Sequence, residues 1–226
     1  MNVGDVGTIR YAAEVAKQKR KLAKQIGDCL QPSAFDQPTR YFAPLGAVKA
    51  LISRPAVRAA LGYGPRAADI DPALLDYIVS EAGILFAILV HLGLQDRIIE
   101  QAMVLFQRHS VHDQSLPFEA TGHGSKLTMV DPGETVWSAE RRSNFYDRQW
   151  IFLAPVFSTE HPICILEKNR ILPFNLDPGR SAIDHGRNVP LRVTIPQSHI
   201  EGPSNVVRIA QKVVDHDARF LSNQCQ

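Results

Sequence analysis

Apolar residues keep a helical spacing through much of the first half of the chain, and the clearest case is the segment from Pro72 to about His91. Its second half is apolar almost all round, which is typical of a helix buried between other helices. Asp71 is a start signal for this segment and Gly93 is a stop signal. The pattern predicts one continuous buried helix. Its core positions are Leu74, Ile78, Leu85, Leu89 and Leu92.

Shorter helical patterns lie on both sides of this helix. The segment Thr8–Ile26 favours a polar helix capped by its first residue, because Ala, Lys, Gln and Glu dominate its composition. After a proline-rich linker, two short helices are predicted on either side of a break at Ser53–Pro55, and the second ends at Gly62 or Gly64. Apolar positions in residues 96–108 predict one more helix.

In the second half, short apolar runs separated by polar turns replace this pattern, and such runs are typical of strands. They read "ICIL" from Ile163, "PLRVTI" from Pro190 and "NVVRIAQKVV" from Asn205. The segment Thr121–Glu134 is rich in Gly, Ser, Asp and Pro, so it predicts a loop.

The predicted fold class is therefore α+β, with helices first and strands later. Residues 1–118 are expected to form an α-helical domain, of which residues 1–45 are a basic helix and a linker. Residues 119–142 are expected to form a loop or linker. Residues 143–226 are expected to hold an aromatic helix and the strands.

The segment Ser143–Ser158, "SNFYDRQWIFLAPVFS", concentrates aromatic residues unusually. Its helical face would consist of Tyr146, Trp150, Leu153 and Phe157. Ser143 or Asn144 would cap this helix, and Pro155 would end it because proline disfavours helix at the residue before it. The pattern favours a short helix that docks its aromatic face on the core. A ligand-stacking surface is the alternative.

Composition narrows the class of protein. The chain has 226 residues, of which 45% are hydrophobic, so it is long and apolar enough for a globular core. The net charge of +2 gives no argument for nucleic-acid binding, and the basic residues are not interleaved with aromatic ones. Cys29, Cys164 and Cys225 are scattered, which supports neither a disulfide framework nor a zinc site and favours a reducing compartment.

The terminal and apolar segments predict an intracellular, cytoplasmic protein. The N-terminus lacks the apolar stretch of a secretory signal. The longest apolar run, Ala82–Leu94, is shorter than the roughly 20 residues that cross a bilayer, and His91 interrupts it. The basic run Lys17–Lys24 favours a solvated helix face, with a nuclear import signal or an acidic partner as alternatives.

Motifs of common enzyme classes are missing from the sequence. It contains no phosphate-binding loop, no dinucleotide fingerprint and no hydrolase serine elbow. His109 and His112 have a spacing that metal ligands can use, and Asp113 lies beside them. No fourth ligand is evident, so a polar cluster at a helix end is the favoured interpretation and no metal site is assigned.

The aromatic segment, followed by "ILPF" at Ile171–Phe174, resembles a group of filamentous-fungal protein-kinase-like proteins. In that group a helical region leads into Q-W-x-F-L-A-P-V-F, then L-P-F, and then the opening of a kinase N-lobe. The earlier "ILFAILVHLGL" and "HDQSLPF" are also similar, and the resemblance covers roughly residues 47–220. The signature positions, expected to serve packing, are Trp150, Phe152, Leu153, Pro155, Phe157, Leu172, Pro173 and Phe174.

The resemblance implies where ATP contacts would lie. Gly186 would belong to the glycine-rich turn over the phosphates, and Lys212 of "IAQK" would be the strand lysine that pairs with them. The sequence departs from the pattern, because Gly186 is the only glycine in that turn and Pro190 replaces a strand valine. Gln211 replaces the usual apolar residue before the lysine.

The catalytic parts of a kinase are also missing, because nothing resembles H-R-D-x-x-x-x-N or D-F-G. The resemblance therefore implies a non-catalytic, truncated kinase-like protein, a pseudokinase-like fragment that needs no cofactor and works as a protein-interaction module for a protein partner. The alternative is the N-terminal regulatory and partial ATP-binding part of a longer serine/threonine kinase, with ATP and magnesium as its cofactors.

Overall fold

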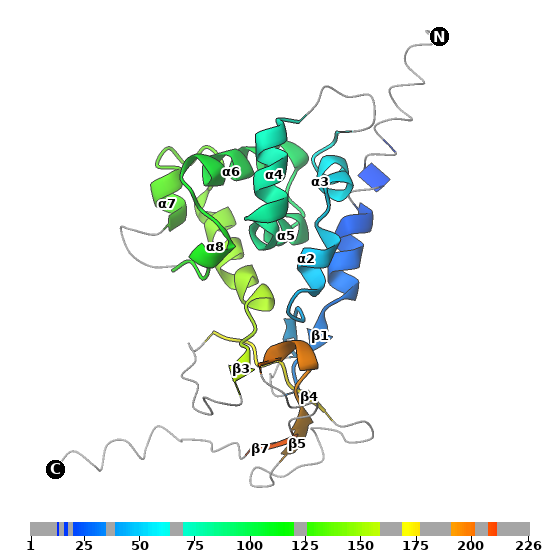
Figure 1. The fold of residues 1–226 in the computed structure, drawn as a ribbon. Helices are drawn as coiled ribbons and strands as arrows, with labels where there is room; N and C mark the ends of the chain where they lie inside the picture. Colours follow the sequence, from blue (N-terminus) through cyan, green and yellow to red (C-terminus); the bar gives the residue numbers. More distant parts are fainter. Residues whose placement is uncertain are drawn as a thin grey trace, which may run out of the picture.

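The computed structural model describes residues 13, 16–17, 20–34, 39–63, 70–119, 126–158, 169–176, 191–201 and 208–211. Within these ranges the chain is α+β, as predicted. Helices gather at one end of the molecule and short strands at the other (Figure 1).

Most of the helices come early in the chain. They are α2 (Ala47–Leu51), α3 (Arg54–Ala60), α4 (Pro72–Ser80), α5 (Gly83–His91), α6 (Asp96–Arg108), α7 (Lys126–Val130) and α8 (Ala139–Arg148). Short 3-10 helices are η1 (Asp113–Ser115), η2 (Gln149–Phe152) and η4 (Gln197–His199). Residues 20–28 are helical too, and a turn at Cys29 follows.

The strands are short and pair in small sheets. Strands β1 (Gln31–Pro32) and β2 (Tyr41–Phe42) pair antiparallel. Strands β3 (Phe157–Ser158) and β6 (Ile200–Glu201) pair in parallel. Strands β4 (Asn175–Leu176), β5 (Leu191–Thr194) and β7 (Arg208–Gln211) form an antiparallel sheet in that order. Strands were predicted over "PLRVTI" and "NVVRIAQKVV", and β5 and β7 confirm both. The "ICIL" run lies outside the described residues.

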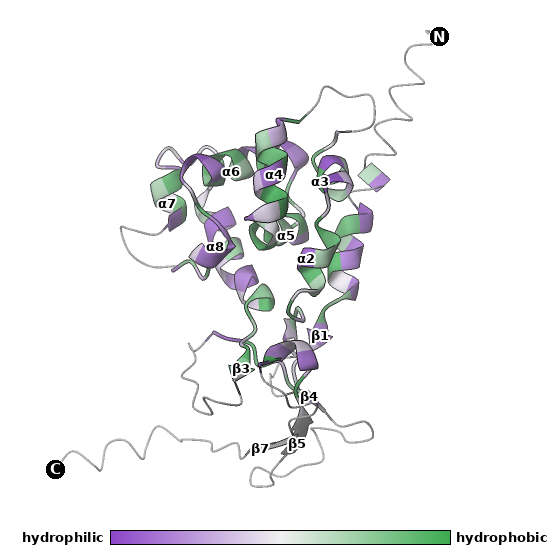
Figure 2. Cartoon of the chain, viewed as in Figure 1, coloured by the Kyte–Doolittle hydropathy of each residue, from purple (hydrophilic) through white to green (hydrophobic). Residues whose placement is uncertain are grey.

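The predicted buried helix exists, but it is not continuous. Residues 85–89 of α5 have no exposed surface, which confirms burial between other helices, and Figure 2 shows α5 as a mainly hydrophobic element among them. The chain bends by 93° between α4 and α5. The prediction of one helix was wrong because the side chain of Asp113 caps the N-terminus of a second helix, α5. Its carboxylate accepts the N–H groups of Ile84 and Leu85 at 3.0 and 3.1 Å.

Several helix signals acted as predicted. Ser53 stands at the N-cap position of α3 before a proline, although its hydroxyl makes no capping hydrogen bond. Asp71 accepts the N–H of Ala73 at 2.9 Å and caps α4. Gly62 and Gly93 follow their helices with φ of 84° and 70°, the left-handed conformation that glycine adopts without strain.

The loop predicted for Thr121–Glu134 was wrong in part, because α7 lies within it. Leu127 and Val130 sit three residues apart on this helix and are buried against the core. Their contacts with the core outweigh the polar composition of the segment.

The aromatic segment does not form one helix with one aromatic face, so that prediction was also wrong. α8 begins earlier, after Ser138, whose hydroxyl accepts the N–H of Arg141 at 3.3 Å. It ends at Arg148 and tightens into η2, and Phe157 lies on a strand. The tighter 3-10 turn and Pro155 rotate the later side chains away from the face that helical spacing predicts.

Candidate functional site

The aromatic segment connects two hydrophobic clusters of the described residues. Phe145, Tyr146 and Phe152 belong to the large cluster between the helices. Phe157 packs against a second, small cluster whose buried members are Phe174, Ile195 and Ile200. The segment is therefore the joint between the helical part and the strand part of the molecule. In Figure 1 the chain runs down from η2 to β3 at this joint.

Gln149 anchors the upper end of this joint. Its side chain is 1% exposed, and its Oε1 accepts the N–H of Phe118 at 2.7 Å. Its Nε2 donates to the carbonyls of Phe118 at 2.8 Å and of Tyr146 at 3.2 Å. The amide thus satisfies the buried backbone of Phe118 as a neighbouring strand would. This pairing physically links "LPF" of residues 116–118 to "QW" of the aromatic segment.

Four aromatic rings pack together, and one of them, Phe145, belongs to α8. Phe118 stacks on Phe145 with ring centroids 5.5 Å apart, and Trp137 meets Phe145 edge to face at 5.3 Å. Phe106 contacts these rings from α6. Trp137 and Phe145 have no exposed surface, so these two rings act in packing and offer no face to a ligand.

Trp150 and Leu153 are held by an arginine from a later part of the chain. The Arg170 guanidinium lies 5.5 Å from the centroid of the Trp150 ring, within cation–π range. Its Nη1 also donates to the carbonyl of Leu153 at 2.5 Å. One face of Trp150 is therefore occupied by this cation.

The "LPF" of residues 172–174 completes the lower end of the joint. Phe174 stacks with Phe157 at 5.7 Å between ring centroids, and its carbonyl accepts the N–H of Ala34 at 2.8 Å. Pro173 is buried beside it, and Leu172 packs against the small cluster. Six of the signature positions thus lie in or against the two clusters or against Arg170, and Pro173 is buried next to Phe174 in the sequence. The eighth, Pro155, contacts a histidine.

That histidine is His199, which the sequence did not single out. Its ring is 1% exposed, and Nδ1 lies 2.9 Å from the carbonyl oxygen of Pro155. Nε2 accepts the N–H of Leu45 at 3.0 Å, and Phe42 meets the ring edge to face at 5.7 Å. His199 lies in a polar stretch of the sequence, as several other histidines do, so no sequence signal distinguishes it from them.

The proposed ATP contacts Gly186 and Lys212 lie outside the described residues. The strands beside them are described: β5 begins at Leu191, which pairs with Gln211, the last residue of β7. The last residue of β7 therefore lies beside the first residue of β5.

Of the three residues His109, His112 and Asp113 near the end of α6, Asp113 is the one that caps α5. Asp113 faces the N-terminus of α5, and His112 lies 3.8 Å from the carboxylate of Glu81, while His109 is exposed. Burial raises the pKa of Asp113, although the N–H groups of Ile84 and Leu85 oppose that shift. In the described part of the chain, no group of three or more His, Cys, Asp or Glu side chains could hold a metal ion.

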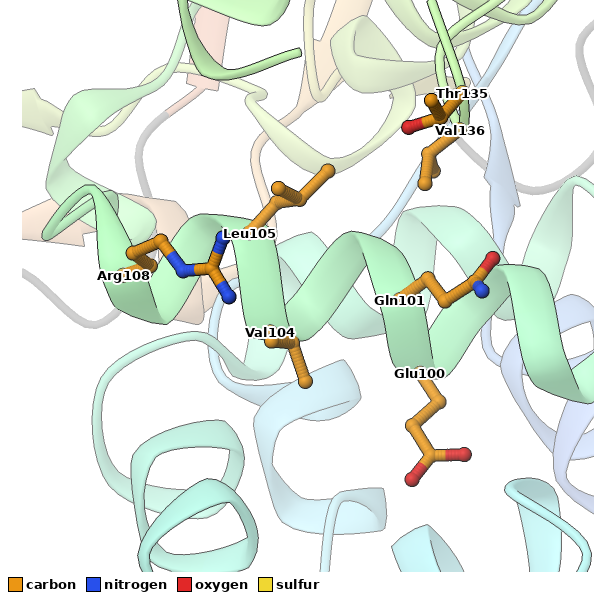
Figure 3. Close-up of a pocket in the computed structure, with 7 residues that line it drawn as sticks. All are labelled: Glu100, Gln101, Val104, Leu105, Arg108, Thr135 and Val136. Atoms are coloured by element: carbon orange, nitrogen blue, oxygen red, sulfur yellow. The ribbon is translucent and has the colours of Figure 1, made fainter.

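A cavity of about 420 Å³ lies beside α6 (Figure 3). Leu105 points from the helix toward Val136, whereas Glu100 points to the other side. Glu100 accepts a hydrogen bond from the Tyr63 hydroxyl at 2.6 Å, which leaves Arg108 as the other charged lining group. Among the described lining residues, Thr135 has a hydroxyl that donates to the Asp131 carboxylate at 2.8 Å, and that carboxylate also accepts two backbone N–H groups of the same turn. The pair thus serves the turn, and the lining suits binding rather than catalysis.

In the described residues no single helix is long and apolar enough to cross a membrane, and only the sharply bent pair α4 and α5 passes that test together.

Comparisons with protein-family models, with curated proteins and with solved structures find no match to this chain.

Proposed function

We propose that the chain is a non-catalytic, protein-kinase-like protein that works as a protein-interaction module. The observation that carries the proposal is the joint itself. Signature residues that resemble the fungal kinase-like group lie along it, with Phe152 in the helical cluster and Phe157 and Phe174 in or against the small cluster of the strand part.

The order of the later strands supports the kinase-like part of this proposal. β4, β5 and β7 pair antiparallel and in chain order, which is how the first three strands of a kinase N-lobe run. Gly186 falls between β4 and β5 in the sequence, where the glycine-rich turn belongs. Lys212 directly follows β7, where the strand lysine belongs.

The non-catalytic part rests on the chemistry of phosphoryl transfer. That reaction needs an aspartate that orients the attacking hydroxyl, and an aspartate with an asparagine that hold magnesium. The sequence has no motif for these groups. The cavity beside α6 offers the helical part a mixed polar and apolar surface for a protein partner.

The second candidate function is the front of a longer serine/threonine kinase. The position of Lys212 after a strand paired with β5 favours it, because that is where a phosphate-binding lysine would be useful. In this function Gly186 and Lys212 would contact ATP.

Thermal unfolding with and without Mg-ATP separates the two. We expect no measurable rise in Tm, and the same result for Lys212→Ala and for the exposed control Lys17→Ala. A rise of several degrees that Lys212→Ala abolishes and Lys17→Ala keeps would overturn the non-catalytic function in favour of the kinase front.

The interaction function has its own test on α6. Arg108→Glu reverses the charge that lines the cavity, and Arg97→Glu makes the same change at an exposed position of the helix that does not line it. We expect proteins that co-purify with the wild type to be lost with Arg108→Glu and kept with Arg97→Glu. Equal sets for both variants would contradict a partner site at this cavity.

A further inference from the structure

We infer that His199 is a pH-sensitive latch: its neutral ring fastens the strand part to the helical part, and protonation of the ring releases the strand part while the helical core stays folded. This inference does not depend on the proposed function.

The geometry of the ring places the latch at the joint. His199 comes from the end of η4, directly before β6. Its nitrogens contact Leu45, which follows β2, and Pro155 in the aromatic segment. One side chain therefore fastens segments that are far apart in the sequence, and β6 in turn pairs with β3.

The partners of the two nitrogens assign the protonation state. Nδ1 faces the carbonyl oxygen of Pro155, so it must carry a hydrogen and donate. Nε2 faces the N–H of Leu45, so it must present its lone pair and accept. Only the neutral ring with hydrogen on Nδ1 satisfies both. A proton added to Nε2 would oppose the N–H of Leu45 across 3.0 Å.

The surroundings of the ring favour this neutral state. Burial lowers the pKa of His199, and the carbonyls of Pro155 and Ala43 only partly oppose that effect. Phe42 covers a further side of the ring. In the described segments packed around it, 41–45, 153–158 and 197–201, the titratable side chains besides His199 are Tyr41 and Glu201, and both are exposed.

The sign of the pH dependence follows from this lowered pKa. An opened joint returns the ring to water, where its pKa is about 6.5. The opened state then binds more protons than the closed state, so closure is fully stable above about pH 6.5 and weakens as the pH falls. One pH unit below that value favours opening by up to about tenfold.

Release stays local because the strand part has a much smaller buried core than the helical part. Its small cluster has Phe174, Ile195 and Ile200 as buried members, whereas the helical cluster extends from Leu22 to Phe152. Small units with few apolar contacts open below the free energy of global unfolding. His91, whose pKa burial also lowers, lies in the helical part against Phe152, so it cannot account for opening confined to the strands.

The experiment combines two measurements on the whole chain. Nitrogen-15 NMR of the histidine rings at pH 7.5 should show His199 with hydrogen on Nδ1 and a bare Nε2. Hydrogen exchange, corrected for the intrinsic effect of pH, should show residues 195–201 losing about tenfold protection between pH 7.5 and 5.5. Residues 83–91 should keep theirs.

Variants isolate the residue. His199→Asn keeps a donor toward Pro155 but cannot titrate, so protection of residues 195–201 should be lower at both pH values and equal between them. The exposed control His109→Gln should behave like the wild type. A hydrogen on Nε2 at pH 7.5, equal loss of protection in both parts, or pH dependence that survives His199→Asn would each overturn the latch. If His199→Asn does not fold, the wild-type measurements decide.

Discussion

Gln149 shows how much a single polar residue contributes to this fold. It is almost fully buried, yet every hydrogen-bonding group of its amide faces backbone at good distance. Buried amides of this kind cost free energy unless they are paired, so the residue fits only because Phe118 presents both a donor and an acceptor to it.

Gln149→Leu should therefore be strongly destabilising. The substitution keeps the volume of the side chain but leaves the N–H and carbonyl of Phe118 buried without this partner, which should cost about 3 kcal/mol of unfolding free energy. Urea denaturation measures the loss. Gln101→Leu, an exposed change on α6, should stay within about 0.5 kcal/mol of the wild type. Equal effects of the two substitutions would show that the Gln149 pairing is unimportant.

Asp131 makes a similar arrangement in the turn between α7 and α8. Its carboxylate accepts the N–H groups of Val136 and Trp137 at 2.7 and 2.8 Å, and both the N–H and the hydroxyl of Thr135. Burial opposes its charge, but these hydrogen bonds outweigh that effect and lower its pKa. This turn positions Trp137. No sequence pattern indicates that Trp137 is a core residue, because its neighbours in the sequence are mainly polar.

Asp131→Asn should lose part of this network. The amide can accept through only one oxygen, so we expect a cost of about 1–2 kcal/mol at pH 7. Because the pKa of Asp131 is lowered on folding, its contribution is present above about pH 3.9 and is lost as the pH falls through the folded value. The difference in stability between wild type and variant, measured by urea denaturation, should be constant from pH 7 to 5. A difference that vanishes within that range would contradict the account.

At the scale of elements, the break between α4 and α5 depends on Asp113. The carboxylate replaces the missing helical partners at the N-terminus of α5, and it approaches from η1, after α6. Because the capping residue is far from the break in the sequence, the residues at the break itself carry no helix-start signal. The apolar periodicity alone therefore predicted one helix.

Asp113→Ala should remove this cap and cost about 1–2 kcal/mol. Asp113→Asn should cost less than half as much, because its oxygen still accepts from the first turn, and because burial raises the pKa of Asp113 and so disfavours its charged form. Thermal and urea unfolding give both values, with the exposed Asp147→Ala as a control. A larger cost for Asn than for Ala would contradict the capping role.

Elements marked by local signals were predictable from the sequence. Helix α6 matches its predicted range, and α3 and α4 begin at the expected Ser53 and Asp71. Strands β5 and β7 lie within predicted runs. Two of the errors share a cause, because α7 and the α4–α5 break are decided by contacts with distant residues. The course of the aromatic segment instead follows from the 3-10 turn η2 and from Pro155. The partners of His199 lie about 44 and 154 residues away, which no local pattern can reveal.

At the scale of the whole molecule, the joint divides the described residues into a large helical cluster and a small strand cluster. We expect the helical part to fold without the strands. A chain ending at Ala154 keeps Gln149 and Phe152 and should retain a cooperative thermal transition by circular dichroism, with a Tm lower by several degrees. A shortened chain without a cooperative transition would contradict this division.

Our central proposal is a kinase-like chain that works in protein interaction without catalysis. The most direct test is isothermal titration calorimetry of the whole chain with Mg-ATP. We expect no heat of binding. Binding that Lys212→Ala abolishes and Lys17→Ala keeps would contradict the proposal and favour the front of a longer kinase.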